Sequence, residues 1–279
     1  MKIGEDDILI HSLKALKLIR DSKEEKCIDL SKIEKITPFY IAPLTAFLKS
    51  NTDFTFELPE DPYKLFYLET IQFPQTISEV PRQKTTYTPL FEIKGELGEG
   101  EYNEEILDLL EKIIVENFEL VNNKQILMFV INELICNIQQ HSESKFNCIQ
   151  AQMYENKLAI SLIDTGITIP GRYKRAGYKE SEKNLELFKL AFEGISTKDD
   201  KERGTGIQNS YKCICRALKG SIVVISNNCG FKKISTEENI EFIDLDNLNL
   251  SFNGTIINLL FEKPTQKLDI YPYLEQSFY

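Results

Sequence analysis

The chain contains 279 residues, of which 42% are hydrophobic and 27% are charged, and this is the composition of a globular protein rather than a fibrous or disordered one. Its formal net charge of −10 argues against a broad nucleic-acid-binding surface, which would be basic. The N-terminus is acidic and lacks the apolar core of a signal peptide, and no apolar run approaches the ~20 residues that span a bilayer. We therefore expect a soluble protein without a membrane segment.

The six cysteines indicate neither a disulfide framework nor a zinc site. No pair has the spacing of zinc ligands, and Cys213 and Cys215 would point about 200° apart on the helix predicted around them. Only two histidines are present. We expect reduced thiols and hence a cytoplasmic protein.

Residues 1–80 have the pattern of a small α/β domain. Leu9, Leu13, Leu16 and Ile19 recur at helical spacing, and Pro38 stands where a second helix would begin. Helices are predicted around 9–19 and at 39–48 and 63–71, with short strands at 27–30 and 54–58. Residues 81–100 follow as a linker, because they are rich in proline, threonine and charge and show little periodicity.

Residues 101–265 form the second predicted domain, and residues 266–279 an acidic, aromatic tail. Helices are predicted at 103–119, 123–141, 182–193 and 206–219, and strands at 147–154, 157–163, 221–226, 241–244 and 254–261. The third helix has Ser181 as its expected cap and Gly194 after its end, within an otherwise irregular stretch. Because helices and strands are segregated into runs, we predict an α+β fold whose second domain is a two-layer sandwich, with helices on one face of a mixed sheet.

The helix at 123–141 carries a seam of three polar residues. Glu133, Asn137 and His141 lie at roughly 0°, 40° and 80° around its axis, with apolar residues on both sides, so we expect a mostly buried helix. Buried polar side chains are costly unless they find partners. Either internal hydrogen bonds or a ligand or metal would have to satisfy these three, and their common seam weighs for the ligand as much as for the hydrogen bonds.

Three short motifs follow along the chain. The sequence DTG at 164–166 ends an apolar strand, where a carboxylate can accept a hydrogen bond from a bound ring, although this pattern also makes ordinary turns. The sequence GTG at 204–206 precedes a helix, where it is either a phosphate-binding N-terminus or a flexible turn. The sequence GT at 254–255 opens the last strand. A basic run at 172–179 is either a phosphate contact or a solvated face.

In this order the motifs resemble the ATP-binding domain of the GHKL ATPases, the family of gyrase, heat-shock chaperones, histidine kinases and MutL. The resemblance covers about residues 100–262 and rests on Glu-x-x-x-Asn-x-x-x-His, Asp-x-Gly, Gly-x-Gly and Gly-Thr. The stretch LAFEGISTK at 190–198 also resembles the lid of members close to anti-sigma-factor kinases and sensor kinases. The resemblance implies the Bergerat ATP-binding fold, with ATP and Mg²⁺ as ligands.

On this resemblance, Asn137 would hold Mg²⁺, and Glu133 would act as the catalytic base toward the attacking water or hydroxyl. Asp164 would accept a hydrogen bond from the adenine amino group. Gly166 would let the base approach, and Thr255 would support the adenine end through Asp164 or a water molecule.

The resemblance also assigns the lid. Gly204 and Gly206 would let it wrap the phosphates, with Lys198 as a phosphate contact. His141 either marks the end of the family's helix or merely caps it. The chain departs from the family at Thr168, because the family often has Asp-x-Gly-x-Gly, and this departure bears on the lid more than on the adenine contact.

The N-terminal region resembles the STAS fold of anti-anti-sigma factors, through CIDL at 27–30 and ITP at 36–38 before the second helix. Members that act as phosphoswitches have a serine at the start of that helix. Pro38, Phe39 and Tyr40 occupy the stretch here, so we assign no regulated serine.

Three classes of function remain open on the sequence. The first is an anti-sigma-type serine/threonine protein kinase that acts on a regulatory partner such as a sigma factor or a STAS-type protein. The second is an ATP-operated switch or ATPase that transfers no phosphate to protein, and the third is a non-catalytic interaction protein. A histidine kinase is disfavoured because His11 lacks the surrounding acid-Arg-Pro pattern. A homodimer is compatible with each class.

Overall fold

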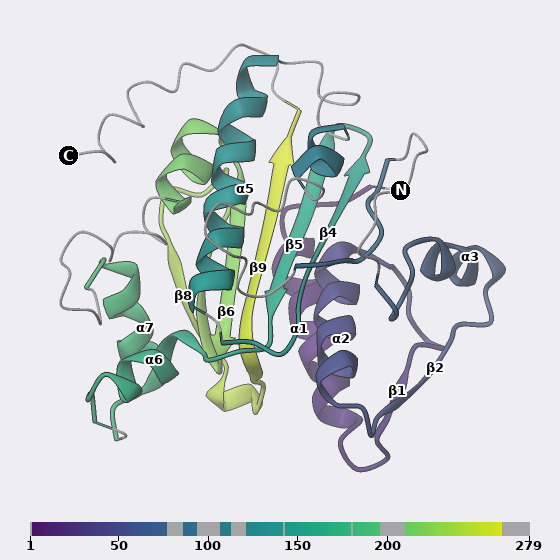
Figure 1. The fold of residues 1–279 in the computed structure, drawn as a ribbon, viewed down its shortest axis with the longest axis horizontal. Helices are drawn as coiled ribbons and strands as arrows, with labels where there is room; N and C mark the ends of the chain where they lie inside the picture. The colour runs from purple at the N-terminus through teal and green to yellow at the C-terminus, as the bar shows by residue number, and fades with distance from the viewer. Residues whose placement is uncertain are drawn as a thin grey trace.

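The structure is a computed structural model that describes residues 2–76, 86–93, 107–112, 121–141, 143–179, 181–195 and 210–263. At its centre lies a seven-stranded sheet in the order β3-β4-β5-β9-β6-β7-β8 (Figure 1). The strands are β3 (Phe91–Glu92), β4 (Asn147–Tyr154), β5 (Lys157–Asp164), β6 (Ser221–Asn227), β7 (Cys229–Lys233), β8 (Glu241–Asp244) and β9 (Phe252–Glu262). Every neighbouring pair in this sheet is antiparallel, so the prediction of a mixed sheet is wrong.

The central strands of the sheet are apolar on both faces. The sequences LAISLI in β5 and TIINLLF in β9 are almost entirely buried. A strand that is apolar on both sides has to be covered on both sides. This explains why helices pack on both faces of the sheet.

One face is covered by α1 (Asp7–Asp21) and α2 (Pro38–Ser50), which Figure 1 shows side by side behind the strands. Their apolar residues share one buried cluster with Val223, Ile225, Ile256 and Leu260 of the sheet. A buried hydrogen bond also joins the layers, because Asn258 Nδ2 donates to Ser12 Oγ over 2.7 Å. The two helices are therefore an integral layer of the sheet's packing.

The opposite face is covered mainly by α5 (Val121–His141). Its buried residues share a second core cluster with the sheet: Leu127, Val130, Ile131, Leu134, Ile135 and Ile138. The smaller elements α6 (Ile169–Arg175), α7 (Asn184–Phe192) and the π-helical turn η1 (Cys213–Ala217) follow in the chain, and a 3-10 turn, η2, spans Asp246–Leu248.

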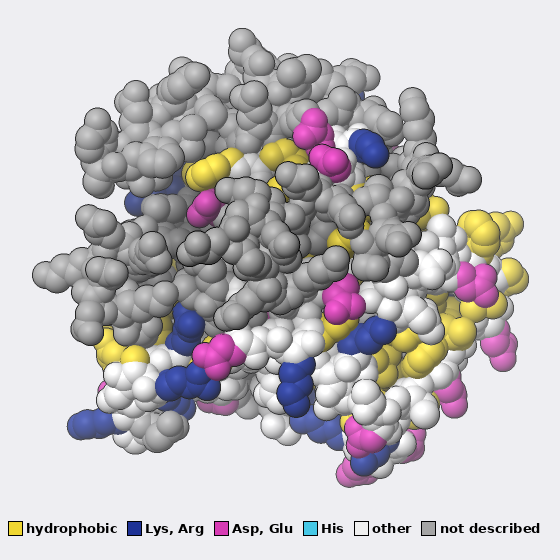
Figure 2. Space-filling model, viewed as in Figure 1, with side chains coloured by type: hydrophobic (Ala, Val, Ile, Leu, Met, Phe, Trp, Pro, Cys, Tyr) yellow, Lys and Arg dark blue, Asp and Glu magenta, His cyan; other side chains and the backbone are white. Residues whose placement is uncertain are grey.

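The α+β class is confirmed. The described helices of residues 101–265 contribute to one cluster on the α5 face, as predicted, but the two-layer arrangement is wrong because α1 and α2 cover the other face. Three layers are present, and the extra layer comes from segments that we predicted as part of a separate small domain. The remainder of that segment lies at one side of the molecule: a parallel pair, β1 (Cys27–Asp29) with β2 (Thr55–Glu57), and the helix α3 (Pro62–Thr70). Hydrophobic side chains gather on this side in Figure 2, where α3 leaves Tyr63 and Phe66 exposed.

Several predicted elements are shifted or new. The helix α7 begins at Asn184 after Lys183, so Ser181 does not cap it, although Gly194 follows it with a positive φ of 80° as expected. The helix α6 lies in the stretch that we expected to be irregular. Among the described residues, no helix is long and apolar enough to cross a membrane.

Candidate functional site

The centre of the candidate site is Asp164, the last residue of β5. Its side chain is only 3% exposed, and it accepts a hydrogen bond from the Gly166 backbone N–H at 2.9 Å and another from Thr255. Burial raises the pKa of Asp164 to about 6, while these hydrogen bonds and the charge of Arg172 pull the pKa back down. The carboxyl is thus a buried acceptor that is largely ionised at neutral pH.

Asp164 does not stand alone, because two neighbouring strands place polar side chains beside it. The register pairs Asp164 with Thr255 on β9, and Thr255 with Ser226 on β6. Side chains alternate along a strand, and the residues two positions away on each strand, Leu162, Val224 and Ile257, belong to the core cluster beneath α5. All three polar side chains therefore lie on the α5 face of the sheet, at one end of it.

Gly254 explains why a Gly-Thr pair begins this part of β9. Its φ is +131°, and a Cβ at this position would lie 2.0 Å from the backbone oxygen of Asp164. Only glycine allows the two strands to approach this closely next to the carboxyl. The sequence motif, which carries little information by itself, thus has a definite steric basis.

Ser226 is a member of the site that the sequence did not single out. Its hydroxyl donates to the Gly254 backbone oxygen at 2.8 Å, accepts from the Ile169 backbone N–H at 2.9 Å, and lies 3.3 Å from Thr255 Oγ1. It therefore ties the start of α6 to the sheet beside Asp164. The signal in the sequence was a serine at the end of an apolar strand, which is too common to be specific.

Thr168 has a structural role at the position where the Asp-x-Gly-x-Gly pattern of the resemblance would place a glycine. Its hydroxyl accepts from the Gly171 backbone N–H at 3.1 Å and so caps the N-terminus of α6. The departure from the glycine pattern coincides with a helix, which sets the direction of the chain directly after Asp164.

The basic run at 172–179 lies on and beyond α6. Arg172 is half-buried. Burial lowers the pKa of its guanidinium, and the nearby charges of Glu143 and Asp164 act in the opposite direction. Arg175 Nη1 already donates to both carboxylate oxygens of Glu143, at 2.6 and 2.8 Å. The charge of Arg172 lowers the pKa of Asp164 and so acts on the candidate site.

The polar seam of α5 is more accessible than we predicted. Glu133 is exposed and Asn137 is half-buried, and the neighbouring Phe129 is 41% exposed. The expectation of a mostly buried helix is therefore wrong, because only the side that contains Val130 and Leu134 packs on the sheet. The carboxylate of Glu133 and the amide of Asn137 are both accessible to solvent.

The structure brings together some of the predicted site residues and not others. Asp164, Gly166 and Thr255 are in direct contact. Glu133 and Asn137 lie on the helix that covers the same face, and no hydrogen bond joins them to Asp164 in the described part of the chain. Lys198, Gly204, Gly206 and the side chain of His141 lie outside the described residues.

The donor set can be compared with the needs of Mg²⁺, which takes oxygen ligands and usually only one or two from the protein. Asn137 supplies an accessible amide oxygen and Glu133 a nearby carboxylate on the same helix. Within the described ranges, no cluster of three or more His, Cys, Asp or Glu side chains could hold a metal by itself. A magnesium ion here would need a ligand such as a polyphosphate to complete its shell.

All of these features concern one end of the sheet and the helix above it. No protein-family model matches the chain, and no curated protein matches it in sequence. The function has to be inferred from the residues and geometry of the site.

Proposed function

We propose that the chain binds Mg-ATP on the α5 face of the sheet and acts as a cytoplasmic regulatory protein of the GHKL type, with a STAS-like N-terminal region. The observation that carries this proposal is Asp164. A buried carboxyl at the end of a strand, held by Gly166 and Thr255 and approached closely by Gly254, is suited to accept a hydrogen bond from a planar ligand.

The adenine end of the nucleotide would lie at Asp164. With a pKa of about 6, the carboxyl is ionised at pH 7 and can accept from the adenine amino group. A buried acceptor that pairs with a ligand N–H discriminates strongly against ligands that lack the donor. This role accounts for a carboxylate at a position where burial makes its charge unfavourable.

The phosphate end would lie along the exposed seam of α5. Asn137 would ligate Mg²⁺ through its side-chain oxygen, and the metal would neutralise the phosphate oxygens. Glu133, exposed one turn earlier, would take the proton from the attacking water or hydroxyl. By resemblance, Lys198, Gly204 and Gly206 would contact or enclose the phosphates.

The acceptor of the phosphate would be a hydroxyl on a regulatory protein, as in an anti-sigma-type serine/threonine kinase. The same residues would also serve an ATP-operated switch that hydrolyses ATP without transfer to protein. A sigma factor or a STAS-type protein is the class of partner that the resemblance implies, and a second copy of the chain is compatible with it.

Calorimetry with Mg-ATP tests the binding proposal. The wild type should bind with a measurable heat, and Asp164→Asn should weaken binding at least tenfold, because a buried acceptor would become a partial donor. The matched control is Asp244→Asn, which changes an exposed aspartate at the end of β8 in the same sheet. Equal affinity in both variants, or no heat with the wild type, would exclude Asp164 as the nucleotide site.

A second pair of variants tests the division of roles on α5. Asn137→Ala should lose the dependence of ATP binding on magnesium, whereas Asn132→Ala, half-buried on the same helix, should keep it. Glu133→Ala should retain nucleotide but release no product. With candidate partners and labelled ATP, labelled partner supports the kinase, inorganic phosphate alone supports the switch, and binding without either product leaves a non-catalytic protein.

A further inference from the structure

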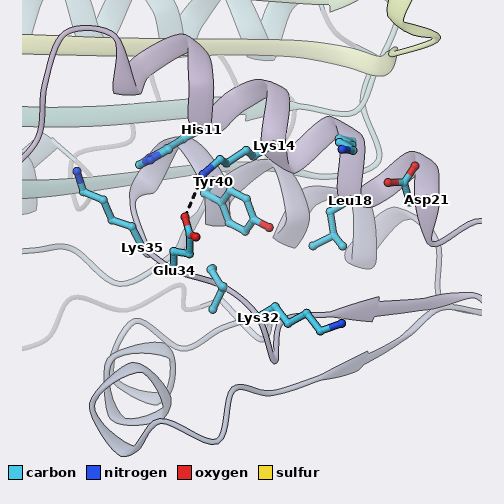
Figure 3. A pocket seen from close by; sticks show the side chains of 10 residues that line it. His11, Lys14, Leu18, Asp21, Lys32, Glu34, Lys35 and Tyr40 are labelled. Carbon is cyan, nitrogen blue, oxygen red and sulfur yellow. Dashed lines mark hydrogen bonds and ion pairs between the residues drawn. The ribbon is translucent and has the colours of Figure 1, made fainter.

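A hollow lies far along the chain from Asp164, between α1 and the loop at residues 31–37 that leads into α2 (Figure 3). It has a volume of about 320 Å³, which lies within the range of small-molecule sites. Its walls are formed by His11, Lys14, Lys17, Leu18, Asp21, Lys32, Ile33, Glu34, Lys35 and Tyr40.

The charge of this cavity is opposite to that of the protein. Four lysines line it against two acids, in a chain whose net charge is −10. Lys14 forms an ion pair with Glu34, with its Nζ 3.4 Å from Oε2. Lys35 forms another with Asp7, with its Nζ 2.7 Å from Oδ2. The lining Asp21 is in turn neutralised by Arg20, whose Nη2 lies 2.7 Å away.

Two of the lysines form no ion pair within the described ranges: Lys17 on α1 and Lys32 on the loop, both of which are exposed. The charge of Lys32 does reach Asp29, where it adds to the hydrogen bonds from Ser31 in lowering the pKa of that carboxyl. In Figure 3, Lys14, Lys32 and Lys35 lie on different sides of Tyr40, so the lysines reach the hollow from both α1 and the loop. A compact anion in the hollow could therefore draw ammonium donors from two elements.

The rest of the wall is apolar or neutral. Leu18 and Ile33 contribute hydrocarbon, and burial raises the pKa of Tyr40 to about 12, so that its phenol stays neutral. The His11 Nδ1 lies 2.8 Å from Thr37 Oγ1, and burial lowers the pKa of this histidine, which is therefore neutral at pH 7. The excess positive charge of the lining is thus carried by the lysines.

We propose that this cavity binds a small organic phosphate, with the phosphate at Lys17 and Lys32 and the organic part against Leu18 and Ile33. A phosphate dianion is the compact ligand that several lysine ammonium groups satisfy best. The apolar wall favours an organic ester over the inorganic ion. The rim acids Asp21 and Glu34 oppose an extended polyanion, which favours a small molecule over a nucleic acid.

Phenyl phosphate is a suitable probe, because it combines a dianion with one ring. Calorimetry with the full chain should show saturable binding, and this binding should be tighter than that of inorganic phosphate and weaker at high salt. The double variant Lys17→Gln/Lys32→Gln should bind phenyl phosphate at least roughly tenfold more weakly than the wild type, since it loses two charge-assisted contacts. The matched control, Lys23→Gln/Lys49→Gln, changes two exposed lysines that do not line the cavity and should bind as the wild type does.

A second measurement does not depend on the variants' folding. Phenyl phosphate should protect Lys17 and Lys32 of the wild type from acetylation, as followed by mass spectrometry, and should leave Lys23 unprotected. Binding in Asp164→Asn should match the wild type, because the two sites are separate. Absent saturation, equal weakening in both lysine pairs, no selective protection, or loss of binding in Asp164→Asn would each overturn the proposal.

Discussion

The replacement of Asp164 by asparagine separates a functional carboxylate from a structural one. Burial raises the pKa of this carboxyl from 3.8 to about 6. A group with a raised folded pKa favours the folded state below its unfolded pKa, and this contribution is lost as the pH rises through the folded pKa. This contribution to stability is therefore lost between about pH 4 and pH 6. Above that range the charged form makes folding about 3 kcal/mol less favourable.

Asparagine has nearly the same shape, carries no charge, and can still accept from the Gly166 N–H. Relative to wild type, Asp164→Asn should therefore gain stability at pH 8, by up to about 3 kcal/mol, and the gain should shrink to roughly half at pH 5. Urea unfolding at the two pH values measures this difference, with Asp244→Asn as an exposed control that stays within ~0.5 kcal/mol of wild type. If Asp164→Asn is instead less stable by the same amount at both pH values, the carboxylate is a structural hydrogen-bond acceptor and the reasoning from burial is refuted.

Three further outcomes follow from the same end of the sheet. Gly254→Ala should lose about 3 kcal/mol or more of stability, because its Cβ would lie 2.0 Å from the Asp164 backbone oxygen at a positive φ. The control Gly4→Ala should keep the wild-type melting temperature, because its Cβ would meet nothing closer than 3.8 Å. Ser226→Ala should destabilise by about 1–3 kcal/mol in urea unfolding, since the Ile169 N–H would lose its acceptor, and an unchanged midpoint would contradict this. In the wild type, Mg-ATP affinity should decrease below pH 6 as the Asp164 carboxyl becomes protonated, whereas pH-independent calorimetric affinity would argue against an adenine contact there.

Much of the local structure could be predicted, because hydrophobic periodicity and turn residues determine it. The strands at 147–154 and 157–163 and the helix that begins at Pro38 appear almost where the sequence predicts them. The contact of Asp164 with Thr255 also agrees with the pairing that the motifs implied. In these cases the determining residues lie within or next to each element.

The errors arose where distant segments decide the outcome. The unbroken apolar runs of β5 and β9 indicated two covered faces, but the sequence does not state which helices cover them. The helix α6 spans only seven residues, too few for a periodic signal, and its capping by Thr168 shows only in the hydrogen bond to Gly171. Ser226 joined the site through register, which depends on how β6 aligns with β9.

The layer formed by α1 and α2 has a consequence for dissecting the protein. A shortened chain that begins at residue 101 would turn the apolar side chains of Val223, Ile225, Ile256 and Leu260 toward water. Such a surface promotes self-association, so the C-terminal portion should be poorly soluble by itself and should recover when the first fifty residues are supplied as a separate peptide. The amino-terminal helices would then keep the sheet soluble by covering its apolar face.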